Sequence, residues 1–479
     1  MPKVRLNQLF SGAPDVEVVD LVHDSRQVRP GSLFFCVSGF RDDGHLFAAD
    51  AVERGAAALV VERPLGLGVP EIVVPLVRAE MAPAASRFFG DPSHELSVLG
   101  VTGTNGKTTT TFLLRSILQA SGRRCGLIGT IRRVVGGREQ PSERTTPEAI
   151  DLQRELRNMV EAGDEACALE VSSHGLSLCR CDATHFAATI FTNVTQDHLD
   201  FHHTMEEYFQ AKRRLFVGDA GVAIINVDDP YGARLARELP DPCTYAIEAA
   251  ADYRAEVLRT DASGSRLRLR SPNHRLDIQS PLAGRFNVFN ALGAFAAATE
   301  LGIEPDAIVE GFRGSDTVPG RFERVDLGQP YSVFVDYAHT PDALANVLDA
   351  ARKLTERRLI CVFGCAGDRD QSTRPAMGRI ASRLCDEVIL TSDNPNSEEP
   401  RQIIDEILAG TLKRASAIVD RLGAIQHAIE SAQPGDTVLI AGRGHEQKQR
   451  FPGGRTVTFD DRLAVRGAVR QRVAGVMSR

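Results

Sequence analysis

The sequence predicts an α/β protein of two to four domains, with three as the central expectation. At roughly 100–200 residues per domain, a chain of 479 residues is too long for one small module. Short apolar runs typical of β-strands alternate with helical patterns, which is the order of elements in parallel sheets. This alternation breaks at residues 318–321 and then starts afresh, so we place a domain boundary near residue 320.

The first segment, residues 1–92, is predicted to be a small α/β module. Gly, Pro and Asp separate its short runs. A helical pattern covers residues 45–55, and strand-like runs lie at residues 16–19, 33–37, 58–61 and 72–77. No long flexible linker follows, so we expect short connections between domains.

The second and third segments, residues 93–318 and 319–479, are each predicted to contain a wound parallel sheet. An apolar run, a Gly-rich turn, a helix-like stretch and another run form one βαβ unit at residues 96–129. Further strand-like runs of the second segment lie at residues 166–171, 187–192 and 222–227. Those of the third lie at residues 333–337, 359–364, 387–391 and 437–441, each before a helix-like stretch.

Composition excludes several classes of protein. Hydrophobic residues at 43% and charged residues at 25% are an ordinary globular mixture, so a mainly disordered or fibrous chain is excluded. The net charge of -7 and the absence of a long basic block argue against nucleic acid as a partner. The start lacks a signal peptide, and no window approaches the ~18 apolar residues of a membrane span.

The cysteines point to a reducing compartment. There are nine, they are scattered, and none forms a CxxC pair, so we expect free buried thiols and no structural zinc. A soluble, cytoplasmic protein with no membrane partner is the expectation.

The sharpest motif is Gly-Thr-Asn-Gly-Lys-Thr at residues 103–108, between a predicted strand and a predicted helix. Backbone N–H groups of such a turn and the positive end of the helix can hold phosphate, Lys107 adds a point charge, and the Thr108 hydroxyl can bind Mg²⁺. The strict phosphate-loop spacing is missed by one place, because the nearest upstream glycine is Gly100. The alternative is a Gly-rich turn with an exposed lysine. The motif alone predicts an ATP or GTP site.

Acids and histidines follow later strands of the same predicted sheet. Glu170 ends one apolar run, and His198 follows another, so both are expected to converge on the phosphate loop. Both are candidate Mg²⁺ ligands. Magnesium prefers oxygen donors, so His198 could instead orient a ligand or cap a helix. Lys212 lies in a helical pattern with two neighbouring arginines, which by itself indicates a solvated basic face.

Polar residues follow the predicted strands of the last segment. Residues 336–341 open a helix with Pro near its start, which is a ligand-facing position. Three further polar loops, at residues 367–370, 393–396 and 442–446, suggest a second substrate site. Any one of them could be a capped turn, but three together argue against that interpretation.

Taken together, these motifs resemble the Mur ligase family over essentially the whole chain, and in particular its branch that adds the third amino acid to the cytoplasmic peptidoglycan precursor. The resemblance implies three domains: a UDP-binding N-terminal α/β domain, a central P-loop-like ATPase domain and a C-terminal Rossmann-like domain that binds the amino acid. It also implies a monomer. The matching motifs are residues 24–26, 30–34, 43–45, 102–109, 170–175, 192–198, 287–290, 320–323, 336–342, 367–370, 393–395 and 442–446.

The resemblance implies an ATP- and Mg²⁺-dependent peptide ligation. ATP phosphorylates the free γ-carboxylate of UDP-N-acetylmuramoyl-L-alanyl-D-glutamate, and the amine of a diamino acid then attacks the acyl phosphate, giving an amide, ADP and phosphate. Such phosphoryl transfer needs mainly positioning and neutralised charge.

Site residues are carried over by position. The catalytic candidates are Lys107, His198 and Lys212, and the magnesium neighbourhood is Thr108, Glu170, His198 and Lys212. The nucleotide contacts are Gly103, Thr104, Asn105, Gly106, Lys107, Thr108, Thr109, Asn287, Arg321 and Asp336. The UDP-sugar-peptide contacts are Ser25, Thr145, Thr146, Ser172 and Arg180. The amino-acid contacts are Arg369, Asp393, Asn394, Asn396, Gly442 and Glu446.

The resemblance reverses the interpretation of Lys212. The matching lysine of the family is carbamylated, and a carbamate can ligate Mg²⁺ where an ammonium would repel it. We therefore expect Lys212 to be modified.

One departure concerns the incoming amino acid. Family members that add meso-diaminopimelate carry Arg where this chain has Asn396, and a guanidinium can bind the distal carboxylate with two hydrogen bonds. Asn396 favours L-lysine or L-ornithine, which lack that carboxylate. Arg369 keeps meso-diaminopimelate as an alternative. Leu178, where relatives often have Gln, is left out of the site.

Two other classes share parts of this pattern. A ligase similar to folylpolyglutamate synthetase would share the ATP loop, but residues 24–26 and 393–395 argue against it. A non-catalytic nucleotide-binding protein would need neither a Mg²⁺ carboxylate nor Lys212.

Overall fold

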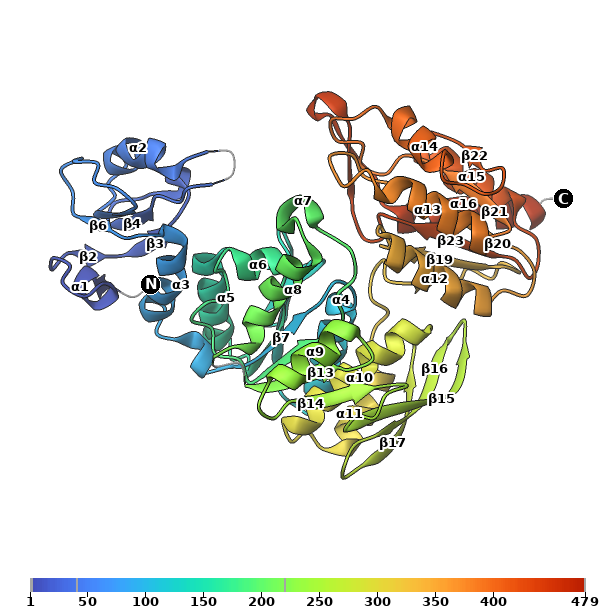
Figure 1. The fold of residues 1–479 in the computed structure, drawn as a ribbon, viewed down its shortest axis with the longest axis horizontal. Coiled ribbons are helices and arrows are strands. Elements are labelled where there is room, and N and C mark those ends of the chain that lie inside the picture. The colour runs from blue at the N-terminus through green and yellow to red at the C-terminus, as the bar shows by residue number, and fades with distance from the viewer. Residues whose placement is uncertain (1–2, 40–41, 219–220, 478–479) are drawn as a thin grey trace.

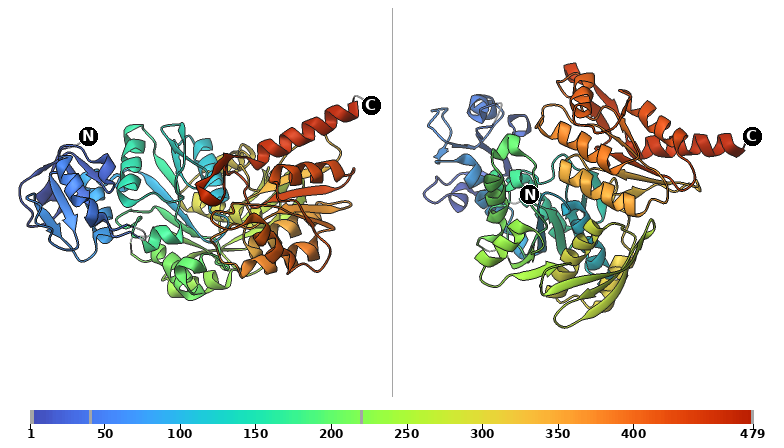
Figure 2. Two further views of the ribbon diagram at one scale, coloured as in Figure 1. Left: turned by 90° about the horizontal axis from the view of Figure 1, so that it is seen from above. Right: turned by 45° about the vertical axis from the view of Figure 1, so that its right-hand side comes forward.

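The computed structural model describes residues 3–39, 42–218 and 221–477 and has three α/β lobes (Figure 1). The chain runs from the N-terminal lobe through the central lobe, which carries the widest sheet, to the C-terminal lobe. The turned views in Figure 2 show the C-terminal helix projecting beyond its lobe. The predicted α/β class with parallel sheets is confirmed.

The N-terminal lobe contains a parallel four-stranded sheet of order β3-β4-β5-β6 and a small antiparallel pair, β1-β2. Its strands are β1 (Val4–Arg5), β2 (Glu17–Val18), β3 (Asp20–Val22), β4 (Ser32–Phe35), β5 (Ala58–Val61) and β6 (Glu71–Val73). Its α-helices are α1 (Leu6–Leu9), α2 (Ala48–Glu53) and α3 (Val77–Phe88). The predicted strand at 72–77 is too long, because Val77 begins a helix.

The central lobe is built on an eleven-stranded sheet of order β10-β9-β8-β11-β7-β12-β13-β14-β15-β16-β17. Its strands are β7 (Ser97–Thr102), β8 (Cys125–Ile128), β9 (Arg132–Val135), β10 (Arg138–Pro141), β11 (Ala166–Glu170), β12 (Ala188–Phe191), β13 (Val222–Asn226), β14 (Cys243–Ala246), β15 (Tyr253–Asp261), β16 (Gly264–Arg270) and β17 (Arg275–Ser280). Its α-helices are α4 (Lys107–Ala120), α5 (Ala149–Glu161), α6 (Ser173–Ser177), α7 (Leu199–His202), α8 (Met205–Arg213), α9 (Pro230–Glu238), α10 (Arg285–Glu300) and α11 (Pro305–Arg313).

Strands β8, β11, β7, β12, β13 and β14 are parallel, so the loops after them meet at one edge of the sheet. Strands β11 and β12 flank β7, with Glu170 opposite Val101 and Phe191 opposite Thr102. The loops after these three strands therefore lie together.

The C-terminal lobe has a six-stranded sheet of order β18-β19-β23-β20-β21-β22. Its strands are β18 (Glu323–Arg324), β19 (Ser332–Asp336), β20 (Leu359–Phe363), β21 (Glu387–Leu390), β22 (Ser416–Ala417) and β23 (Thr437–Ala441), with a separate hairpin of β24 (Lys448–Arg450) and β25 (Thr456–Thr458). Its α-helices are α12 (Pro341–Lys353), α13 (Thr373–Leu384), α14 (Pro400–Leu408), α15 (Arg421–Ser431) and α16 (Asp461–Met477). Strands β19 to β23 are parallel, so the four predicted polar loops share one edge.

The cores of the three lobes are apolar. All nine cysteines are free, and eight of them are buried. Among the described residues, no helix combines the length and apolar character that a membrane span needs.

Candidate functional site

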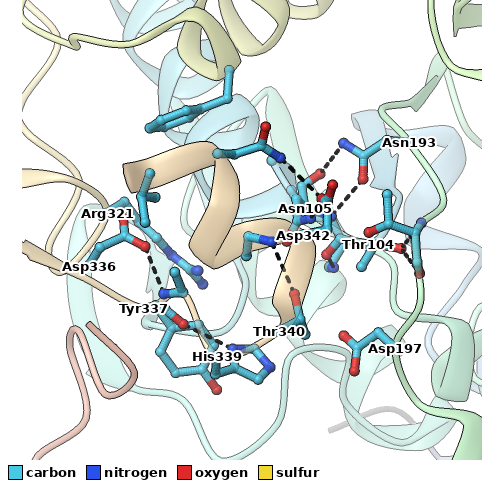
Figure 3. A pocket seen from close by; sticks show the side chains of 18 of the residues that line it. Thr104, Asn105, Asn193, Asp197, Arg321, Asp336, Tyr337, His339, Thr340 and Asp342 are labelled. Carbon is cyan, nitrogen blue, oxygen red and sulfur yellow. Dashed lines mark hydrogen bonds between the residues drawn. The ribbon is translucent and has the colours of Figure 1, made fainter. Parts of the chain in front are cut away.

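A cavity of about 860 Å³ lies between the central and C-terminal lobes. We call it the interdomain cavity; the loops after β7, β11 and β12 line it from one side, and those after β19, β20, β21 and β23 from the other. Figure 3 shows Asn105 and Asn193 of the central lobe facing Asp342 at the start of α12. The predicted residues that line it are Thr104, Asn105, Gly106, Lys107, Thr108, Thr109, Thr145, Glu170, Ser172, His198, Arg321, Asp336, Arg369, Asp393, Asn394, Asn396, Gly442 and Glu446. Those outside its lining are Ser25, Gly103, Thr146, Arg180, Lys212 and Asn287.

The phosphate loop is a tight turn that needs its two glycines. Gly103 has φ 148° and Gly106 has φ 92°, values that side chains rarely adopt. A Cβ on Gly103 would lie 1.8 Å from the Thr192 hydroxyl oxygen, so the backbone there packs closely against the residue that follows β12. The loop is held from that side, because Asn105 N donates to Asn193 Oδ1 at 2.9 Å. The backbone N–H groups of the loop therefore lie at the N-terminus of α4, where a helix can bind phosphate.

Lys107 begins α4 and folds back over the loop. Its Nζ donates to Gly103 O at 2.8 Å and to Thr104 O at 2.9 Å. Burial lowers the pKa of Lys107, while the negative charges of Glu170 and Asp197 oppose that shift. The side chain lines the cavity and donates only to neutral carbonyls, so an anion in the loop would be a stronger acceptor.

Glu170 is a carboxylate at the end of a buried strand, with 1% of its surface exposed. Its Oε2 accepts from the Thr108 hydroxyl at 3.0 Å and the Thr130 hydroxyl at 2.9 Å, and its Oε1 accepts from Thr130 N at 2.8 Å. These donors are neutral, and a buried carboxylate surrounded by neutral donors is a good place for a hard cation. Sequence reasoning missed Thr130, which is separated from Glu170 by 40 residues.

His198 is held by its acidic neighbour. His198 Nε2 lies 3.4 Å from Asp197 Oδ2, and the ring of His174 packs edge-on at a centroid distance of 4.7 Å. Burial lowers the pKa of His198 to about 3, so the imidazole is neutral and one ring nitrogen can accept. Within the described residues, no three His, Cys, Asp or Glu side chains are arranged as a metal site.

Lys212 is buried, with 1% of its surface exposed, so the solvated basic face indicated by its local sequence is wrong. Its Nζ donates to Gly103 O at 3.0 Å and lies 4.3 Å from the centroid of the Tyr208 ring. No ion pair of Lys212 is found within the described residues. Burial and the charge of Lys107 hold the pKa of Lys212 well below its usual range. The side chain therefore reaches the underside of the phosphate loop.

Arg321 and Asp336 come from the C-terminal lobe. Arg321 Nη2 donates to the Thr108 hydroxyl at 3.2 Å, and its guanidinium lies 4.5 Å from the centroid of the Tyr337 ring (Figure 3). Asp336 accepts from Phe322 N at 2.6 Å and Ala338 N at 2.7 Å. Burial raises the pKa of Asp336 to about 6. Asp336 thus ties the residue after Arg321 to the loop that follows β19, and Arg321 itself reaches the phosphate loop.

Asn287 does not line the interdomain cavity, whereas Asn290, one helical turn later, does. Asn287 donates to Ala283 O at 2.8 Å and accepts from Asn290 Nδ2 at 3.0 Å. A second unpredicted contact is Asn105 Nδ2, which donates to Asp342 Oδ2 at 3.1 Å and joins the two lobes. Asn290 and Asp342 lie within the motifs at residues 287–290 and 336–342, although neither is among the predicted site residues.

The loops after β21 and β23 form an acidic corner of the cavity. Asp393 Oδ2 is buried and has no hydrogen-bond partner among the described residues, and Asp393 Oδ1 accepts from Asn394 N at 2.7 Å. Asn394 Nδ2 donates to Glu446 Oε2 at 2.7 Å. Gly442, with φ 113°, leaves room here, because a Cβ would lie 2.5 Å from Asp393 Oδ2. Burial and Asp393 raise the pKa of Glu446. This corner offers acceptors to an ammonium.

Two loops beside the acidic corner are joined by Asn396. Its Nδ2 donates to Gly367 O at 2.8 Å, and its φ of 53° is one that Asn tolerates. Arg369, on the same loop as Gly367, is exposed and donates to Asp200 Oδ2 at 3.4 Å across the cavity. The structure therefore brings Asn396 and Arg369 to one end of the cavity.

The remaining predicted residues lie toward the N-terminal lobe. Thr146 Oγ1 donates to Glu170 O at 2.8 Å, and Ser172 N donates to Thr146 Oγ1 at 3.0 Å. Arg180 donates to Thr146 O at 3.0 Å and to Glu148 Oε1 at 2.8 Å. Ser25 begins a short 3₁₀ helix in the N-terminal lobe. Thr145 and Ser172 link this group to the interdomain cavity.

Comparisons with known proteins cover most of the chain. Three family models match: "Mur ligase family, catalytic domain" at residues 17–87, "Mur ligase middle domain" at residues 101–298, and "Mur ligase, glutamate ligase domain" at residues 320–444. The chain is similar to the UDP-N-acetylmuramoyl-L-alanyl-D-glutamate--2,6-diaminopimelate ligase of Geobacillus kaustophilus, at 45% identity over 96% of both chains.

Solved structures agree with this likeness. A structure of a UDP-N-acetylmuramoyl-L-alanyl-D-glutamate--2,6-diaminopimelate ligase matches with a TM-score of 0.71 and 33% identity, over 98% of this chain and 100% of that one. A MurF ligase from Thermotoga maritima in complex with ADP matches with a TM-score of 0.66 and 18% identity, over 95% of this chain and 98% of that one. The second match reports on the fold alone.

Proposed function

The chain belongs to the Mur ligase family and is an ATP-dependent ligase that forms a peptide bond in peptidoglycan precursor synthesis, and we propose that it joins 2,6-diaminopimelate to UDP-N-acetylmuramoyl-L-alanyl-D-glutamate. The observation that carries the proposal is the interdomain cavity. It joins a phosphate loop to an acidic corner suited to the distal ammonium of a diamino acid, so the phosphorylated substrate and the incoming amino acid can meet in one space.

The phosphate loop and Lys107 would hold the transferring phosphate. Backbone N–H groups at the start of α4 and the Lys107 ammonium place positive charge where a phosphoryl group carries negative charge. Arg321, which already donates to Thr108, adds a second cation from the C-terminal lobe. Lys107 belongs to the same lobe as the loop, whereas Arg321 would act on the phosphate only when the two lobes meet, so Arg321 couples lobe contact to phosphoryl transfer.

Magnesium fits the residues beside the loop. Thr108 and Glu170 offer a hydroxyl and a carboxylate oxygen 3.0 Å apart, and His198 stands nearby as a neutral imidazole. A bound Mg²⁺ would supply charge neutralisation to the phosphates. Glu170 alone provides only one anionic ligand for Mg²⁺, so a second anionic oxygen ligand would strengthen magnesium binding here.

Lys212 would supply that group as a carbamate. A buried ammonium with no acidic partner is costly, and a depressed pKa leaves the neutral amine, which is the form that reacts with CO₂. In this reaction the amine nitrogen bonds to the CO₂ carbon and one proton is released, leaving a carboxylate on the long lysine arm. Its contact with Gly103 O places it under the phosphate loop.

The UDP-sugar-peptide would extend toward the N-terminal lobe. Ser172 and Thr145 reach the cavity, and Thr146 and Arg180 lie behind them, so a substrate whose glutamate carboxylate faces the phosphate loop would continue past these side chains. Ser25 would meet its nucleotide end. This assignment predicts that the substrate contacts both lobes.

The names of the similar ligases favour diaminopimelate over the lysine or ornithine that Asn396 alone suggests. The acidic corner of Asp393 and Glu446 suits the amine that all three amino acids share. Only diaminopimelate brings a further carboxylate, which a cation at this end of the cavity can bind with charged hydrogen bonds.

A competition assay tests the proposal. Purified enzyme would receive ATP, Mg²⁺, UDP-N-acetylmuramoyl-L-alanyl-D-glutamate and equal amounts of meso-diaminopimelate, L-lysine and L-ornithine, and product masses would be read. We expect mainly the diaminopimelate product. A lysine or ornithine product would support the ligase activity but reject diaminopimelate as the preferred amino acid. ATP hydrolysis that is indifferent to the UDP substrate would reject the ligase and favour a relative of folylpolyglutamate synthetase.

Substituting Asn396 tests whether this loop sets selectivity. We expect Asn396→Arg to raise the ratio of kcat/KM for diaminopimelate to that for lysine by about tenfold, because a charged hydrogen bond contributes roughly 1.5–3 kcal/mol. Arg at φ 53° is strained by about 1–2 kcal/mol, and this strain offsets part of the binding free energy that the new hydrogen bond contributes. Asn396→Gly is the matched control, since it removes the contact with Gly367 without adding charge. An unchanged ratio in Asn396→Arg would mean that the loop does not choose the amino acid.

A further inference from the structure

An unassigned arginine, Arg450, lines the interdomain cavity beside Asn396. Resting on the proposed function above, we propose that Arg450 binds the distal carboxylate of the incoming amino acid and supplies the positive charge that Asn396 lacks. The distal carboxylate is thus bound by a residue of strand β24, Arg450, instead of by a residue of the loop after β21.

The backbone places Arg450 next to position 396. Asn396 N donates to Arg450 O at 3.2 Å, and Arg450 N donates to Asn394 Oδ1 at 3.0 Å. Strand β24 and the loop at residues 394–396 are thus joined on both sides of Arg450. A long side chain from position 450 can reach the space that a side chain from position 396 would reach.

Strand β24 is fixed by its neighbours, so the base of Arg450 is preorganised. Gln449 Nε2 donates to Asp393 O at 2.6 Å, and Arg443, which is fully buried, donates to Lys448 O at 2.9 Å. Gln449 is buried, and side chains alternate along a strand, so Arg450 leaves on the opposite face, where it is exposed. A site held on a rigid element binds with less loss of entropy.

The charge of Arg450 is available. Its guanidinium forms no hydrogen bond or ion pair within the described ranges 3–39, 42–218 and 221–477. The other arginines at this end of the cavity have partners: Arg369 lies 3.4 Å from Asp200, Arg374 pairs with Glu398 and Glu406, and Arg443 donates to Asn394 Oδ1. Asn396 donates its amide to Gly367 O and carries no charge. A carboxylate arriving here therefore meets Arg450 as the free partner.

The acidic corner favours a cation on the cavity side, because Arg443, which lies 3.4 Å from Glu446, is fully buried and donates to Asn394 Oδ1. Asp393 and Glu446 suit an ammonium, and both would repel a carboxylate on the same carbon as that ammonium. A guanidinium opposite them lets the cavity hold the amine and the carboxylate of one amino-acid end together, with two parallel hydrogen bonds to the carboxylate. Lysine and ornithine lack this carboxylate and gain nothing from Arg450.

The test compares amino acids in one variant. We expect Arg450→Gln to lower kcat/KM for meso-diaminopimelate by about 10–100-fold, mainly through KM, and to lower it far less for lysine. Lys448→Gln, on the same strand but outside the cavity lining, is the matched control and should change neither value. The double variant Arg450→Gln with Asn396→Arg should recover diaminopimelate use, because it returns the charge to the neighbouring position.

The outcomes separate this inference from the proposed function. Equal losses for both amino acids in Arg450→Gln would show a structural role and overturn the inference, as would an unchanged diaminopimelate value. A selectivity change that follows Arg369→Gln alone would assign the carboxylate to Arg369 and also overturn it. If the unsubstituted enzyme made no product with any of the amino acids, the proposed function itself would fail.

Discussion

Lys107→Ala is expected to abolish ligation almost completely, with kcat/KM reduced by at least about 10³-fold. Lys107 is the cation that folds over the phosphate loop, and its present acceptors are the neutral carbonyls of Gly103 and Thr104. When phosphate enters the loop, the ammonium can exchange these carbonyls for an anion, and that gain is largest as charge moves in the transition state. Steady-state measurement of ADP release dependent on the UDP-dipeptide and diaminopimelate gives the value.

The stability of this variant separates catalysis from folding. Burial lowers the pKa of Lys107, which means that the fold disfavours its charge, so removing it should leave the melting temperature within a few degrees. Lys413→Ala is the control, because Lys413 lies outside the cavity lining and donates only to Cys385 O at 3.4 Å. Near-normal turnover of Lys107→Ala would remove Lys107 from phosphoryl transfer.

The parts of the fold that the sequence predicts are those with local signals. Strand β7, the glycines and helix α4 follow one another, so periodicity and turn chemistry locate them within about a residue. Helix α3 was missed because it is buried over most of its surface and has no clear polar face. The antiparallel strands β15 to β17 were missed because their arginine-rich faces resemble loops, although Leu267 and Leu269 alternate with arginines.

The site was predicted where it depends on strand ends, and missed where it depends on contacts between loops. Residues at the ends of parallel strands lie at one edge of the sheet, which is why the positions of Glu170 and Asp393 at the cavity were predictable from the sequence. Nothing local reveals that the Asn396 amide is bound to Gly367 O, or that Arg450 returns to the same loop from a distant strand. These contacts exist only after the chain has folded.

The sequence contains a signal for the burial of Lys212, but the run of three basic residues around it obscures that signal. Tyr208, Phe209 and Leu215 lie four, three and three residues away, and all are buried, so Lys212 stands on the apolar stripe of its helix. Its neighbour Arg213 faces outward and pairs with Glu238 at 2.5 Å. The run of three basic residues suggested one solvated face, whereas the helical period divides them between two faces.

Lys212→Ala is expected to reduce ligation by about 10²–10³-fold, and Lys212→Arg should not restore it. The reason is that the proposed active form at this position is a carbamate, which is anionic, and arginine keeps the positive charge without being able to bind CO₂ as an amine does. Enzyme equilibrated with ¹³C-bicarbonate should show a carbamate carbon by NMR, and this signal should be missing in Lys212→Ala.

The control and the contrary result follow from the geometry of the helix. Arg213→Ala removes a neighbouring positive charge from the outward face, so it should keep both the activity and the carbamate signal. Activity in Lys212→Arg close to that of the unsubstituted enzyme would show that a cation suffices at this position. The lysine would then act on the phosphate loop directly through its bond to Gly103 O, and Glu170 would remain the carboxylate of the magnesium site. If the unsubstituted enzyme shows the carbamate signal and Lys212→Arg loses activity, catalysis depends on a negative charge beneath the phosphate loop.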